Sequence, residues 1–76
     1  MNWIKLTHVS GVDYINLTEV YRIVQTASTD LTFYDANSIL PITYTFSSAQ
    51  ELTEALNKLE RIINTIDIDA LANQGN

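Results

Sequence analysis

The sequence predicts a small α+β domain: an antiparallel meander of four or five strands with one C-terminal amphipathic helix packed on one face. A capping box from Ser48 to Glu51 precedes apolar residues that recur at helical spacing as far as Ile66. Before Ser47, apolar and polar residues alternate in short runs, which is typical of strands with one buried face. The links between these runs are short, and short links require antiparallel neighbours.

Five runs have the alternation and the β-branched or aromatic content of strands. Turn-forming residues separate them, beginning with Gly11, which can adopt a positive φ. Pro41 donates no backbone hydrogen bond, so it belongs at a strand end, an edge or a bulge. The predicted strands are residues 3–9, 14–17, 21–27, 31–34 and 39–46.

A helix over residues 48–66 is about 27 Å long, and a strand of about eight residues has nearly the same length. One helix can therefore cross the whole sheet and cover its apolar face. The alternation assigns these strand residues to the covered face: Ile4, Leu6, Ile15, Leu17, Tyr21, Ile23, Leu31, Phe33, Ile42, Tyr44 and Phe46.

The chain of 76 residues has the length of one domain, and we expect residues 1–66 to form it. Residues 67–76 are an acidic polar tail that either continues the helix or frays. With 46% hydrophobic and 17% charged residues, the composition excludes a disordered chain. The low charged fraction leaves uncharged surface, part of which we expect to be an interface.

The charge balance bears on partners and location. Nine acidic against four basic residues give a net charge of −5, which disfavours nucleic acid and anionic membranes as partners. The absence of cysteine excludes disulfides, thiolate metal sites and cysteine nucleophiles. No apolar run has the length of a signal-peptide core or a membrane span, so we expect a cytoplasmic protein.

One set of strand and turn residues has a recognisable order: Ile4, Leu6, Thr7, Gly11, Tyr14, Asn16, Val20 and Ile23. This pattern resembles the start of the FlbD-like proteins, also called the SwrD family, which are flagellum- and swarming-associated bacterial proteins. The resemblance continues with Leu31-Thr32-Phe33, the turn at residues 35–38 and the capping Ser48. It implies strands followed by a helix, and a flagellar role. Residues 14–23 also look like a segment of LytTR-type DNA-binding domains, which are longer and basic.

Candidate catalytic and metal-binding residues are few. His8 is the only histidine, and Ser10 follows it closely, but nucleophilic catalysis needs a base that a further group orients. We therefore expect His8 to be a surface residue at a strand end. Asp67 and Asp69 lack the further oxygen ligands and the glycine of a calcium loop. The sequence predicts no enzyme activity, no cofactor and no metal site.

The sheet face turned away from the helix is the candidate functional surface, because it combines aromatic side chains with two of the four basic residues. It has three interpretations. Threonine and aromatic residues favour strands, which fits a merely solvated sheet. Aromatic residues and arginine are also enriched at protein interfaces, and aromatic rings can stack on single-stranded bases. The candidate residues are Trp3, Lys5, Thr7, Arg22, Thr32 and Tyr34.

Of these interpretations, we expect a small non-enzymatic protein-interaction module. It would be homo-oligomeric or bind another protein through the uncovered sheet face or through its strand edges, since unpaired edges must be protected or used. The alternative is a single-stranded nucleic-acid-binding protein that uses the same aromatic and basic side chains.

Overall fold

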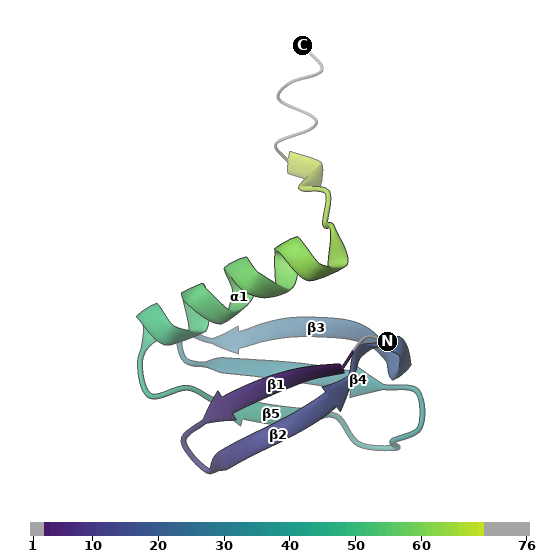
Figure 1. The fold of residues 1–76 in the computed structure, drawn as a ribbon, viewed down its shortest axis with the longest axis horizontal. Helices are drawn as coiled ribbons and strands as arrows, with labels where there is room; N and C mark the ends of the chain where they lie inside the picture. Colours follow the sequence, from purple (N-terminus) through teal and green to yellow (C-terminus); the bar gives the residue numbers. More distant parts are fainter. Residues whose placement is uncertain (1–2, 70–76) are drawn as a thin grey trace.

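The computed structural model describes residues 3–69 and confirms the α+β class, with antiparallel strands followed by one C-terminal helix (Figure 1). A short 3₁₀ turn lies between the second and third strands. The elements are β1 (Trp3–His8), β2 (Gly11–Asn16), η1 (Leu17–Glu19), β3 (Val20–Ala27), β4 (Asp30–Asp35), β5 (Ile42–Thr45) and α1 (Ala49–Ile63).

The strands form two sheets, whereas a single meander was expected. β1 and β2 form a hairpin, and β3, β4 and β5 form a second sheet with β4 in the centre. The division occurs at η1, where the Asn16 side chain accepts a hydrogen bond of 3.1 Å from the Thr18 N–H and turns the chain. The Val9 N–H donates to the Thr45 carbonyl at 2.9 Å, which ties the hairpin to the end of β5.

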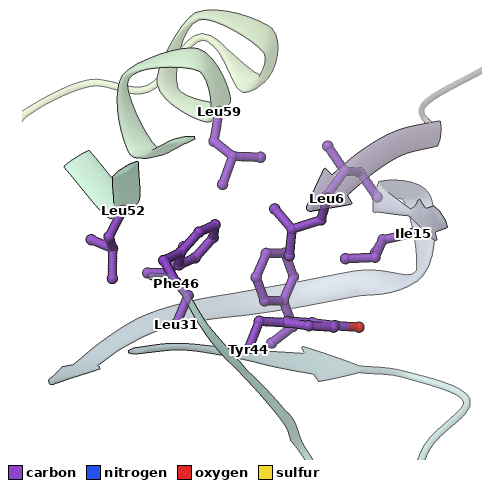
Figure 2. Close-up of a cluster of buried hydrophobic side chains, with 9 residues drawn as sticks. Leu6, Ile15, Leu31, Tyr44, Phe46, Leu52 and Leu59 are labelled. Carbon is purple, nitrogen blue, oxygen red and sulfur yellow. The ribbon is translucent and has the colours of Figure 1, made fainter. Parts of the chain in front are cut away.

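The hydrophobic core lies between the two sheets and α1. Figure 2 shows Leu52 and Leu59 of α1 pointing toward the side chains of both sheets. The rings of Phe33 and Tyr44 meet edge to face, with centroids 5.3 Å apart. The buried hydrophobic residues are Leu6, Ile15, Leu17, Leu31, Phe33, Tyr44, Phe46, Leu52 and Leu59.

Two residues assigned to the covered face are exposed instead. Tyr21 lies at an irregularity in the pairing of β3 with β4, between Val20 and Arg22, which turns its side chain outward. Ile42 begins β5 directly after Pro41 and is also exposed. The last strand therefore starts at residue 42 and not at residue 39, since Pro41 has no N–H to contribute to the ladder.

The helix begins as predicted and ends earlier than predicted. The Ser48 hydroxyl accepts from the Glu51 N–H at 3.1 Å, as the capping box requires. The Glu51 carboxylate accepts from the Ser47 hydroxyl, not from the Ser48 N–H. Asn64 adopts a left-handed φ of 53° and closes α1 at Ile63, short of Ile66.

Two further expectations concern the C-terminal tail and the presence of a membrane-spanning segment. Residues 67–69 follow the helix, and the rest of the expected tail, residues 70–76, lies outside the described residues. Among residues 3–69, no helix has the length and apolar character needed to cross a membrane.

Candidate protein-binding groove

The structure separates the six candidate interface residues into two groups. Trp3, Lys5 and Thr7 lie on β1 in the hairpin, where all three are exposed. The other three, Arg22, Thr32 and Tyr34, lie on β3 and β4 in the second sheet. The six residues that were expected on one sheet therefore belong to two sheets.

The side chains of the second group contact other residues of their own sheet. The Arg22 guanidinium carbon lies 4.9 Å from the centroid of the Tyr34 ring, a cation–π contact. Thr32 is buried, and its hydroxyl lies 3.2 Å from that of Thr26 and 2.9 Å from that of Thr43. This row of hydroxyls joins three strands, so the Thr32 side chain is occupied within the sheet in this structure.

The first group lines a groove between β1 and α1, with a volume of about 540 Å³. Consecutive residues of β1 form one wall and a face of α1 forms the other. Three buried side chains also line the groove, those of Leu6, Phe46 and Leu59. The residues of this β1–α1 groove are Trp3, Ile4, Lys5, Leu6, Thr7, Phe46, Glu51, Glu54, Ala55, Lys58, Leu59 and Ile62.

The groove exists because one edge of β1 is open. Within residues 3–69, β1 has a single strand partner, β2. The Val9–Thr45 hydrogen bond lies beyond the end of the strand and leaves this edge uncovered. In an antiparallel pair, alternate residues direct their backbone groups away from the partner. Those of β1 that point away from β2 therefore have no strand partner among residues 3–69.

The side chains along the groove are mixed in character. Lys5 and Lys58 carry two positive charges, and Glu51 and Glu54 carry two negative charges, so the formal charges cancel. Trp3 and Ile62 are 55% and 56% exposed. β1 and α1 run in opposite directions (Figure 1), so the start of β1 and the end of α1 lie at the same end of the groove. Trp3 and Ile62 make this the apolar end.

His8 is not the surface residue that was expected. Its Nε2 lies 2.5 Å from Asp13 Oδ2 across the hairpin, and the Ser10 N–H donates to its Nδ1 at 3.3 Å. Because Nδ1 accepts, the proton lies on Nε2 and is donated to Asp13. The ring also meets Tyr44 edge on, at 5.0 Å between centroids. Sequence reasoning missed this pair because alternation alone does not define the register that places residues 8 and 13 on neighbouring strands.

Tyr44 is a buried tyrosine whose ionisation is affected by two carboxylates. Burial raises the pKa of Tyr44 above its usual value, and the negative charges of Asp13 and then Asp35 raise it further. Each effect disfavours the phenolate. Tyr44 is therefore held neutral in the core, beside the His8–Asp13 pair.

Metal ligands do not cluster in the described part of the chain, where no three histidine or acidic side chains are placed to hold an ion. Comparisons with family models, with curated proteins and with solved structures found no match to this chain. The resemblance to FlbD-like proteins therefore stays a prediction.

Proposed function

We propose that this chain is a small, non-enzymatic cytoplasmic protein-interaction module that binds an extended segment of a protein in the β1–α1 groove. The observation that supports this is the open edge of β1 beside a helix wall. An extended peptide can add to such an edge as a further strand, with backbone hydrogen bonds supplying affinity and side-chain contacts supplying selectivity.

The groove offers the anchors that such binding needs. Trp3 and Ile62 expose large apolar surfaces at one end, and large side chains of this kind dominate binding energies when a partner covers them. The four charged side chains of the groove cancel, which favours an uncharged, apolar segment over a strongly charged one.

The same argument disfavours the nucleic-acid alternative. Phosphate binding depends on an excess of positive charge, and the groove has no such excess because its two lysines and two glutamates cancel. Arg22, the other candidate phosphate ligand, is stacked on Tyr34 in the second sheet. Binding through backbone groups and apolar side chains should persist at about 0.5 M salt, whereas phosphate binding should weaken steeply.

A displayed library of random peptides, selected on the purified protein, tests the proposal. We expect selected peptides to be extended and apolar, and to shift the amide resonances of β1 and α1 when titrated. Trp3→Ala combined with Ile62→Ser should weaken their binding at least about tenfold, since each anchor contributes on the order of 1 kcal/mol or more. Ile68→Ser is the matched control, because Ile68 is 70% exposed and outside the groove.

Two results would contradict the proposal. One is the recovery of no binding peptide from a diverse library. The other is binding that Trp3→Ala with Ile62→Ser leaves unchanged, because this places the binding surface outside the groove.

A further inference from the structure

The two walls of the β1–α1 groove repeat at nearly the same interval. On β1, the exposed residues occupy alternate positions, so they follow one another at about 6.6 Å. On α1, the exposed groove residues Glu54, Lys58 and Ile62 recur at every fourth position, which is about 6 Å along the helix axis. Because the two elements run in opposite directions (Figure 1), the residues of one wall lie level with those of the other. The level pairs are Trp3 with Ile62, Lys5 with Lys58, and Thr7 with Glu54.

The groove therefore has three levels that differ in character. The first level, at Trp3, is apolar, and the second, at Lys5 and Lys58, is basic. The third level is acidic, because Glu54 lies there and Glu51 lies one turn nearer the start of α1. The charges of the groove cancel in sum, but along the groove they are separated into a basic and an acidic level.

These charges do not neutralise one another within the groove. Among residues 3–69, Lys5 and Lys58 form no ion pair with either glutamate of the groove. The two lysines carry like charge on opposite walls, so an anionic side chain between them is favourable, and the acidic level favours a cationic side chain. Each such contact at a surface contributes little to affinity, but the order of the contacts determines which segment fits and in which register.

We infer that the segment bound in the groove carries a basic, an acidic and an apolar side chain at alternate positions, in that order from its N-terminus. The order follows from antiparallel addition to β1, the more stable arrangement, in which the segment enters beside Glu54 and ends beside Trp3. Its intervening side chains face the buried residues Leu6, Phe46 and Leu59 and are apolar. This inference rests on the proposed function and specifies its ligand, a segment of zero net charge.

The chain itself does not supply this segment in an extended form. Lys5 stands at the middle position of β1, where the groove requires an acid, and like charges on adjoining strands are destabilising. Two copies joined along β1 would therefore repel each other at this residue. The order of basic, acidic and apolar residues occurs once in the sequence, at residues 58–62, which α1 holds as a helix. The segment therefore belongs to a different protein.

Two heptapeptides of identical composition test the order. The ordered peptide is Thr-Lys-Val-Glu-Val-Leu-Thr and the swapped peptide is Thr-Glu-Val-Lys-Val-Leu-Thr, both with blocked ends. Trp3 is the only tryptophan of the chain and lines the groove, so its fluorescence reports the binding of each peptide. At low salt the ordered peptide should bind about tenfold more tightly, since swapping turns two favourable charge contacts into unfavourable ones. Salt at about 0.5 M should reduce this ratio.

A charge swap on the helix wall assigns the preference to the groove. Glu54→Lys with Lys58→Glu preserves the net charge and gives the second and third levels charges of both signs, so the preference for the ordered peptide should be lost. Glu60→Lys with Arg61→Glu is the matched control, because both residues are exposed on α1 and lie outside the groove. This control should keep the preference of the parent.

The outcomes separate this inference from the proposed function. Equal binding of the two heptapeptides to the parent overturns the inference and leaves the proposed function intact, because the groove then binds both without regard to charge order. A preference that the helix-wall swap leaves unchanged also overturns the inference, since the preference then arises elsewhere. If neither heptapeptide binds while library peptides do, the inference is wrong and the proposed function stands. If the library also yields no binding peptide, the proposed function itself fails.

Discussion

At the scale of single residues, polar side chains are buried in this protein where neighbouring residues supply hydrogen-bond partners for them. Thr32 is buried because its hydroxyl finds partners in Thr26 and Thr43 on the adjacent strands. His8 is half-buried because Asp13 and the Ser10 N–H engage both of its ring nitrogens. Alternation of apolar and polar residues carries no information about such partners, which come from neighbouring strands.

The pH dependence of stability should report on Tyr44. Its pKa is raised in the folded protein, so its contribution to stability is fully present below the pKa of the unfolded chain, about 10, and is lost as the pH rises through the folded pKa. Urea unfolding at about pH 8 and about pH 11 should show this loss. Tyr44→Phe should reduce the difference between the two values. An unchanged difference would mean that Tyr44 does not titrate with unfolding.

The two buried leucines of α1 should be the most sensitive positions of the helix. Leu52→Ala or Leu59→Ala should lower the free energy of unfolding by about 2–5 kcal/mol, because each change leaves a cavity in the core. Ile66→Ala, at an exposed position, should change it by less than about 0.5 kcal/mol. Chemical denaturation followed by circular dichroism measures all three. Equal effects of Leu59→Ala and Ile66→Ala would contradict the observed packing.

At the scale of elements, α1 shows which features local rules determine. The capping serine and the leucine spacing define where the helix starts and which face it buries, since both depend on neighbours within a few residues. Its end was not predicted, because the apolar pattern continues to Ile66 while Asn64 adopts the left-handed conformation that closes the helix. Asparagine tolerates that conformation better than most residues.

The cap itself can be tested by one substitution. Ser48→Ala should lower the free energy of unfolding by about 1 kcal/mol, since the Glu51 N–H loses its acceptor. Ser47→Ala is the control, because the Ser47 hydroxyl contacts only an exposed carboxylate and should matter less. Thermal unfolding of both variants measures the difference. A larger effect at Ser47 would place the cap one residue earlier.

At the scale of the whole molecule, the class and the order of elements were predictable, whereas the groove was not. Periodicity identified β1 and α1 separately and placed Trp3, Lys5 and Thr7 on one face of a strand. The groove depends on how the hairpin sits against the helix once η1 has divided the strands into two sheets. That arrangement follows from contacts between distant residues, which a local pattern does not contain.

The sheet topology also bears on how fast the chain can find its fold. Each ladder joins strands that follow one another in the sequence, from β1 with β2 to β4 with β5. The loops that must close before these contacts form are short, so their closure entropy is small. Domains dominated by such local pairings have a low contact order and a correspondingly short conformational search.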